Sequence, residues 1–272
     1  MSPDPGKLLE LAVDVARSAG ELLASYTGRV SVAGTKSSPT DVVTEMDRKA
    51  EDLIRSRILE RRPADVILGE EEGETGDLGG SGVRWVVDPL DGTVNYLYGL
   101  RDWAVSIAAE VSGQIVAGAV FAPRAGELFT ATRGGGAWLS GPSGAAGTRL
   151  CAGPGVALDR ALVATGFGYR PERRQVQGEV VAALLPRVRD IRRGGSASVD
   201  LCAVAVGRVD AYYERGLNYW DYAAGALVAA EAGASVGGLR GAPHSTSMTV
   251  AAGPSLFGPL ARALESLDAE RG

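Results

Sequence analysis

The most constraining feature of this sequence is a short apolar run at 83–87 that ends in Asp-Pro-Leu-Asp-Gly-Thr at 88–93. The run is typical of a buried strand, and the proline and glycine that follow it interrupt regular structure. Asp88 and Asp91 therefore stand three positions apart at a strand end, and Gly92 permits close approach of the backbone. Packing alone does not explain this combination, so we expect a functional site here.

Helical and strand patterns alternate along the rest of the chain. Apolar residues at three- and four-residue steps predict helices, and apolar runs bounded by turn residues predict strands. The predicted helices cover 5–26, 44–62, 172–188, 197–206, 220–232 and 255–267, and the predicted strands cover 66–68, 83–87, 103–111, 115–122, 127–132, 161–165, 190–193, 209–214 and 249–252. The segments 27–41 and 73–82 are predicted loops. The strands at 103–132 suggest an antiparallel meander, and the whole pattern predicts a layered α/β sandwich with mixed and antiparallel sheets.

The length of 272 residues lies between one large domain and two closely associated ones. With 45% apolar and 22% charged residues, the chain falls in the range of ordinary globular proteins. We expect a single domain over 1–272. If it divides, the glycine- and alanine-rich stretch at 141–155 is the best boundary, giving sub-domains 1–145 and 146–272.

Charge and residue usage exclude several function classes. A net charge of −5 without a dense basic run argues against a nucleic-acid partner. The separated Cys151 and Cys202, which we expect in the core, and a single His244, expected at the surface, argue against zinc sites and Ser-His-Asp catalysis. The N-terminus has no leader-like pattern, and no run of ~18 apolar residues occurs. We therefore expect a cytoplasmic protein without a membrane partner, whose chemistry depends on carboxylates and hydroxyls.

Acidic residues at the ends of other predicted elements could join the two acids of segment 88–93. Asp47 begins a predicted helix, Glu70 and Glu71 follow a predicted strand, and Asp221 begins another helix. Two like charges ~4 Å apart repel by about 4 kcal/mol at an effective dielectric of ~20, so such a cluster persists when cations lie among its members. Oxygen ligands without Cys or His select Mg²⁺, Ca²⁺ or Mn²⁺ over zinc.

Each of these acids also has an ordinary structural interpretation. Asp47 could only cap its helix together with Thr44, and Asp221 could only interact with a helix dipole. The acids at 70–72 could form a solvated loop. Segment 88–93 is harder to explain in this way, and it does not fit a calcium-binding EF-hand loop, because apolar Leu90 falls where that loop needs an oxygen ligand.

The motif Asp-Pro-Leu-Asp-Gly-Thr-Val-Asn-Tyr at 88–96 resembles the central signature of the inositol monophosphatase family of metal-dependent, lithium-sensitive phosphatases. Trp-Asp-Tyr-Ala-Ala-Gly at 220–225 resembles the second signature of that family. Residues 44–47, 69–71 and 210–214 also match in type, order and spacing, so the likeness covers nearly the whole chain. The segments 166–169 and 192–197 resemble bacterial, actinobacterial inositol-1-monophosphatases.

This resemblance implies an α-β-α-β-α sandwich, a homodimer, and two to three Mg²⁺ ions in each active site. Mn²⁺ is the expected substitute ion and Li⁺ the expected inhibitor. The implied metal ligands are Glu70, Asp88, the carbonyl of Leu90, Asp91 and Asp221. Asp47 and Thr93 are implied to orient and activate the attacking water, with Glu70 also catalytic through a water on the third ion.

The resemblance also implies which residues lie near the substrate. They are Asp91, Gly92, Thr93, Ser196, Ala197, Glu214 and Asp221. Lys36 is implied to lie on a loop over the metals, and Glu71 beside them. The implied activity is Mg²⁺-dependent hydrolysis of myo-inositol 1-phosphate and related polyol or sugar monophosphates by metal-activated water, without a phosphoenzyme.

Other activities remain open at this point. The same scaffold could act on histidinol phosphate, 3′-phosphoadenosine 5′-phosphate, fructose 1,6-bisphosphate or NADP. A different class is a metal-containing scaffold that mainly binds a protein or an RNA-associated partner. The arginine pairs 173–174 and 192–193 could neutralise the second phosphate of a bisphosphate, but as helix-face and strand-end charges we expect them to be solvated.

Overall fold

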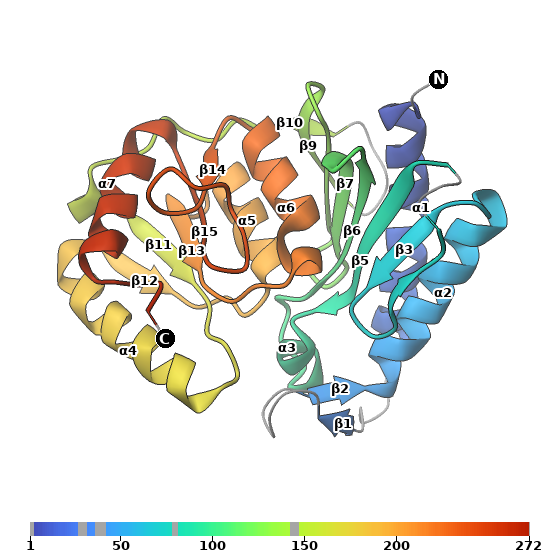
Figure 1. The fold of residues 1–272 in the computed structure, drawn as a ribbon, viewed down its shortest axis with the longest axis horizontal. Coiled ribbons are helices and arrows are strands. Elements are labelled where there is room, and N and C mark those ends of the chain that lie inside the picture. The colour runs from blue at the N-terminus through green and yellow to red at the C-terminus, as the bar shows by residue number, and fades with distance from the viewer. Residues whose placement is uncertain (1–2, 27–31, 36–41, 78–80, 142–146, 272) are drawn as a thin grey trace.

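Five layers make up the fold, in the order helices, sheet, helices, sheet, helices (Figure 1). The structure is a computed structural model, and it describes residues 3–26, 32–35, 42–77, 81–141 and 147–271. The layered α/β sandwich predicted from the sequence is confirmed. Each layer has a physical origin in the apolar pattern of its elements.

The first layer consists of α1 (Pro5–Ser25) and α2 (Glu45–Arg61), which cover one face of an eight-stranded sheet. In α1, one stripe of buried apolar residues from Leu8 to Leu23 faces the sheet. Asp4 caps this helix by accepting a hydrogen bond from the Gly6 N–H, at 2.9 Å. Both helices agree with the ranges predicted from the sequence.

The eight-stranded sheet has the order β10-β9-β8-β7-β6-β5-β3-β4. Its strands are β3 (Val66–Gly69), β4 (Gly73–Thr75), β5 (Val83–Asp91), β6 (Ala104–Val111), β7 (Gln114–Ala122), β8 (Glu127–Thr132), β9 (Gly136–Ser140) and β10 (Thr148–Arg149). Strands β5 to β9 form an antiparallel series, which confirms the predicted meander, and β3 runs parallel to β5.

Strand β5 is longer than the sequence predicts. It continues through Pro89 to Asp91, whereas we expected it to end at residue 87. Its register with β6 shifts between Asp88 and Asp91, and this irregularity accommodates a proline that cannot donate to the ladder. The bulge brings both aspartates to the same end of the sheet.

Several short strands were not predicted. The strand β1 (Val32–Thr35) lies within the predicted loop 27–41 and pairs with β2 (Val42–Thr44), and β4 lies within the predicted loop 73–82. The rest of 27–41, including Lys36, lies outside the described residues, as does 142–146 at the expected sub-domain boundary. Strands this short do not show a recognisable alternation of apolar and polar residues, so their pairing with neighbouring strands defines them.

The central layer consists of α5 (Ala197–Ala205) and α6 (Tyr219–Glu231). Helix α6 packs on β5 to β9 of the first sheet and also on β14 and β15 of the second. Its run from Tyr222 to Ala229 is buried throughout, as expected for a helix covered on both sides.

The second sheet has five strands in the order β12-β11-β13-β15-β14. They are β11 (Leu162–Thr165), β12 (Asp190–Arg192), β13 (Ala211–Glu214), β14 (Ser235–Gly237) and β15 (Thr249–Ala252). The outer face carries α4 (Pro171–Leu184) and α7 (Pro254–Ser266), with short 3₁₀ turns at Leu158–Arg160 and Leu185–Arg187. Helix α4 ends earlier than the predicted 188, because Pro186 in the second turn cannot continue the helical hydrogen bonds.

The two cysteines differ from one another. Cys202 is buried, as predicted, but Cys151 is exposed, which contradicts our expectation of a core residue. Cys151 lies two residues beyond the end of the short edge strand β10, outside the sheet. His244 is half-buried, with its ring edge-on to Tyr222 at 5.4 Å between centroids.

No helix in the described ranges is long and apolar enough to cross a membrane.

Candidate active site

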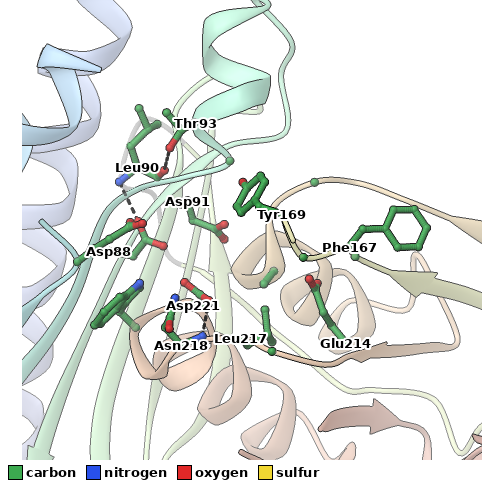
Figure 2. Close-up of a pocket in the computed structure, with 18 of the residues that line it drawn as sticks. Asp88, Leu90, Asp91, Thr93, Phe167, Tyr169, Glu214, Leu217, Asn218 and Asp221 are labelled. Atoms are coloured by element: carbon green, nitrogen blue, oxygen red, sulfur yellow. Dashed lines mark hydrogen bonds between the residues drawn. The ribbon is translucent and has the colours of Figure 1, made fainter. Parts of the chain in front are cut away.

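A pocket of about 420 Å³ opens where the two sheets and the central helices meet. Its wall includes nine of the residues predicted for the site: Glu70, Asp88, Leu90, Asp91, Gly92, Thr93, Ala197, Glu214 and Asp221. Figure 2 shows the Asp88, Asp91 and Asp221 side chains directed into one common space. Asp47 and Ser196 stand behind the wall and contact it through hydrogen bonds, while Lys36 lies outside the described residues.

The turn after β5 depends on a glycine. Gly92 has a φ of 93°, and a Cβ there would lie 2.9 Å from the Asp102 carbonyl oxygen and 3.2 Å from Trp103 Cβ. A larger residue would therefore be strained and would clash. The short helix α3 (Thr93–Leu97), which is not among the predicted helices, begins directly afterwards.

Hydrogen bonds within the turn orient its polar groups (Figure 2). The Leu90 N–H donates to Asp88 Oδ1 at 3.0 Å. Thr93 Oγ1 lies 3.1 Å from the Leu90 carbonyl oxygen and 3.0 Å from Asp47 Oδ1, so its one hydrogen can serve either acceptor. The turn therefore links a pocket carboxylate, a carbonyl and a hydroxyl in one small unit.

Asp91 connects the two halves of the chain. Its Oδ2 accepts hydrogen bonds from the Ser196 hydroxyl at 2.6 Å, the Ser198 N–H at 2.7 Å and the Ser198 hydroxyl at 2.5 Å. Ser196 was implied to lie beside the substrate, and in the structure its hydroxyl holds Asp91. Ser198 was not predicted, although Ser-Ala-Ser at the start of a predicted helix offers hydroxyl and N–H donors to an anion.

Asp47 and Asp221 both occupy the third position of their helices. The Thr44 N–H and hydroxyl donate to Asp47 Oδ2 at 2.8 Å and 2.5 Å, and the Asn218 N–H donates to Asp221 Oδ2 at 2.6 Å. The capping interpretation is therefore correct for Asp47, and Asp221, for which only a helix-dipole interaction was expected, also caps its helix. Capping is nevertheless an incomplete account of both acids. Asp47 also accepts from Thr93, and Asp221 lines the pocket.

The pocket carboxyls hold their protons more tightly than ordinary carboxyls. Burial raises the pKa of Asp88 well above its usual range, and the charges of Glu70 and Asp91 raise it further. Burial and the charge of Glu70 likewise raise the pKa of Asp221. Burial also raises the pKa of Asp91, although the serine hydrogen bonds oppose the shift. The acids are thus close enough to repel one another.

The donor set fits a hard divalent cation. The pocket wall offers carboxylates and the Leu90 carbonyl, and it contains neither histidine nor cysteine. As the side chains stand, no group of three or more His, Cys, Asp or Glu in the described part of the chain has the geometry to hold an ion.

A buried ion pair beneath the Glu70 loop was missed by the sequence analysis. Glu51 and Arg55 are nearly inaccessible, and their charged groups lie 2.8 Å apart. The Glu51 carboxylate accepts the N–H groups of Glu71 and Glu72 at 2.8 Å and 3.0 Å. Arg55 donates to the Gly73 carbonyl at 2.6 Å. The pair fixes the loop that follows Glu70, and its sequence signal is two opposite charges four residues apart beside an apolar helix face.

A glycine makes this arrangement possible. A Cβ at Gly69 would overlap the Glu51 carboxylate and would lie 2.7 Å from Arg55 Nη2. The glycine before Glu70 therefore reflects close approach of the buried pair to β3.

Glu214 is half-buried at the end of β13 rather than an exposed strand-end acid. The Tyr212 hydroxyl donates to Glu214 Oε2 at 2.7 Å. Burial raises the pKa of Glu214 to about 7, against the opposing effect of this hydrogen bond. Nearby Asp200, which the sequence analysis did not single out, has its pKa raised to about 8 by burial and by the charge of Glu214.

Comparison with known proteins gives one consistent result. A family model described as "Inositol monophosphatase family" matches residues 4–269. A Mycobacterium tuberculosis protein named Inositol-1-monophosphatase SuhB is 44% identical over 278 residues, which cover 96% of this chain and 94% of that protein. An Escherichia coli protein named Nus factor SuhB is 40% identical over 246 residues, covering 89% and 88%. The solved structure of Mycobacterium tuberculosis SuhB has a TM-score of 0.82 at 42% identity, covering 98% of this chain and 99% of that one.

Proposed function

Since this chain belongs to the inositol monophosphatase family and is a phosphatase of the inositol phosphate type, we propose that it hydrolyses myo-inositol 1-phosphate and related polyol or sugar monophosphates with Mg²⁺. The observation that carries this proposal is the convergence of Glu70, Asp88, Asp91 and Asp221 on one pocket. The raised pKa values of the three aspartates add support, because bound cations relieve repulsion between neighbouring carboxylates.

The family uses metal ions, and we propose that two to three Mg²⁺ ions bind in this site. The residues that would hold them are Glu70, Asp88, the Leu90 carbonyl, Asp91 and Asp221. When bound, Mg²⁺ offsets the charge of the phosphate and lowers the pKa of water. Mn²⁺ would substitute for Mg²⁺, and Li⁺ would inhibit.

The chain's own groups then position and deprotonate the nucleophile. Thr93 Oγ1, 3.0 Å from Asp47 Oδ1, would orient the attacking water and pass its proton toward that carboxylate. The Thr44 donors to Asp47 Oδ2 keep the base in place. The N–H groups of Gly92 and Thr93 would hold phosphate oxygens at the start of α3. Glu214 and Ala197, on the same pocket wall, would contact the alcohol part of the substrate.

The direct test is a comparison of kcat/KM for myo-inositol 1-phosphate and histidinol phosphate in millimolar Mg²⁺. Higher kcat/KM for myo-inositol 1-phosphate supports the proposal. Preference for histidinol phosphate, 3′-phosphoadenosine 5′-phosphate, fructose 1,6-bisphosphate or NADP would assign a sister activity on the same scaffold, because pocket contacts distinguish these substrates. Failure to release phosphate from any of them would reject the activity.

A second candidate function has one observation in its favour. The Escherichia coli relative is named a Nus factor rather than a phosphatase. A role in binding a protein or an RNA-associated partner is therefore the alternative for this chain. Asp91→Asn separates the two, because a binding role would survive the loss of hydrolysis.

We also propose how the chain is organised. Residues 88–93 come from the range 1–145, and Glu214 and Asp221 come from 146–272, yet all line one pocket. This supports one functional domain over 1–272. We further propose that the protein is cytoplasmic and forms a homodimer, as implied by the family resemblance. Light scattering of the purified protein would test the dimer.

A further inference from the structure

A largely buried polar network joins the first sheet to the central helix α6, and the proposed mechanism does not use it. Glu110 is buried, and Arg84 and Tyr219 are half-buried. Arg84 on β5 and Glu110 on β6 are direct cross-strand partners, and Arg84 Nη2 donates to Glu110 Oε2 at 2.9 Å. The Tyr219 hydroxyl donates to the same oxygen at 2.5 Å, and the Arg84 guanidinium lies over the Tyr219 ring, 5.7 Å from its centroid.

The network holds the turn of α6 that carries Asp221. Tyr219 is the first residue of this helix and Asp221 is the third. Because a helix turns by about 100° per residue, their side chains leave the axis about 200° apart. Asp221 lines the acid pocket and Tyr219 does not (Figure 2). The contact with Glu110 therefore fixes the rotation of this turn from the side away from the pocket. Its other end is Arg84, which lies four residues before Asp88 on the same strand.

Stability alone is a poor reason for charges at this interface. Arg84 Nε is buried and has no hydrogen-bond partner in the part of the chain that the structure describes, which is a cost to the fold. Well-packed apolar residues often replace a buried ion pair without loss of stability. Glu74, whose carboxylate lies 2.9 Å from Arg84 Nη1, is exposed and adds little. The benefit that hydrogen bonds can add here is a fixed geometry, since they depend on both distance and direction.

We propose that Tyr219, held by Glu110 and Arg84, is a positioning residue that fixes Asp221 relative to Asp88 for ion binding. This inference rests on the proposed Mg²⁺ site and names a residue outside that site on which its affinity depends. Mg²⁺ demands nearly ideal octahedral geometry, and ligand distances in metal sites are set to within about 0.2 Å. A small rotation of the first turn of α6 is therefore enough to weaken binding, although Tyr219 touches neither ion nor substrate.

Calorimetric Mg²⁺ titration of the chelator-treated protein, without substrate, tests the proposal. Tyr219→Phe removes only the hydroxyl, and we expect the dissociation constant of at least one Mg²⁺ ion to rise about 10-fold, as for residues that support metal ligands. Glu110→Leu removes the acceptor and should have a similar effect. The double variant should bind no more weakly than the weaker single variant, because both changes act through one contact. Glu110→Gln keeps an acceptor oxygen and should keep most of the affinity. Unchanged Mg²⁺ affinity in Tyr219→Phe, or additive losses in the double variant, would overturn the proposal.

Two neighbouring residues provide matched controls, and both variants should bind Mg²⁺ as the wild type does. Tyr222→Phe makes the same change on the same helix, where the hydroxyl forms no hydrogen bond with any described residue. Glu74→Gln removes an acidic charge from the exposed end of the network and leaves the Tyr219 contact in place. A 10-fold loss of affinity in either control would overturn the proposal, because it would show that the contact is not the cause.

Urea unfolding in chelator separates positioning from stabilisation. If Tyr219→Phe lowers the free energy of unfolding but leaves the Mg²⁺ affinity of the folded protein unchanged, the network only stabilises the fold and the proposal is wrong. If the wild type binds no Mg²⁺, the proposed ion site itself fails and this inference fails with it. That result is distinct from wild-type binding that Tyr219→Phe does not alter.

Discussion

Thr93 Oγ1 lies 3.0 Å from Asp47 Oδ1, although 46 positions separate the two residues in the chain. Asp47 is fully buried at the start of α2, and Thr93 is the first residue of α3. This contact places a hydroxyl between a fixed carboxylate and the pocket, which is the arrangement that proton removal from water requires.

Thr93→Val tests this contact, because valine keeps the shape of threonine and removes only its hydroxyl. We expect kcat to fall by about 10²- to 10⁴-fold, the usual contribution of a general base, with little change in Mg²⁺ affinity. Thr93→Ser retains the hydroxyl and should retain most of the activity. Steady-state kinetics would show this, and near-normal kcat in Thr93→Val would remove Thr93 and Asp47 from the proposed mechanism.

Asp221→Asn should stabilise the metal-free protein and abolish its stabilisation by Mg²⁺. The side-chain oxygen of asparagine can still accept the Asn218 N–H, while the charge that adds to the repulsion among the pocket acids is lost. We expect the free energy of unfolding in chelator to rise on the order of 1 kcal/mol at pH 8, since one pKa unit corresponds to about 1.4 kcal/mol. Urea unfolding with and without Mg²⁺ measures both effects. A variant less stable than wild type in chelator would contradict the repulsion.

Glu51→Gln should destabilise the fold and weaken Mg²⁺ binding together. The substitution leaves Arg55 with only the exposed Glu72 carboxylate, 3.3 Å away, as its charged partner and loosens the loop after Glu70, at a cost of about 3 kcal/mol. Glu45→Gln on the same helix is the matched control, because its pair with Lys49 is exposed and is worth less than about 1 kcal/mol. Calorimetric Mg²⁺ titration of the folded variants separates the two effects. Unchanged Mg²⁺ affinity in Glu51→Gln would show that the pair only stabilises the fold.

Asp200→Asn should flatten the pH dependence of stability in the metal-free protein. The pKa of Asp200 is raised to about 8, so the folded chain keeps a proton that the unfolded chain releases above about pH 4. Stability from this group is therefore full at low pH and is lost as the pH rises toward 8. Urea midpoints at pH 5.5, 6.5 and 7.5 should fall less steeply in Asp200→Asn than in wild type or in the exposed control Asp159→Asn. Parallel slopes in all three proteins would refute the assignment.

The sequence predicts the layered fold well where apolar patterns are long. The helix predicted at 5–26 is observed at Pro5–Ser25, because its buried stripe and its cap are both local features. The same reasoning fails for β4, β9, β10 and β14, whose two to five residues show no period of their own. The sequence also predicts the end of β5 at residue 87 rather than at Asp91, because a bulge can accommodate a proline within a strand and only the partner strand reveals that bulge.

The candidate site also contains residues that the sequence reveals and residues that it does not. Segment 88–93 is recognisable from the sequence because its acids, proline and glycine occur together. Ser198 and Glu51 are not, because their roles depend on partners far away in the chain, at Asp91 and in the loop after Glu70. Arg173 and Arg174 look equivalent at the start of a helix, and only the packing against Gly168 and Gly216 shows which one lines the pocket.

Calorimetric titration of the chelator-treated protein with Mg²⁺, without substrate, tests the central claim most directly. If Glu70, Asp88, Asp91 and Asp221 together bind hard cations, the wild type will bind Mg²⁺ and Asp88→Asn will lose at least one bound ion. Absence of Mg²⁺ binding by the wild type, or identical titrations of the two proteins, would contradict the account.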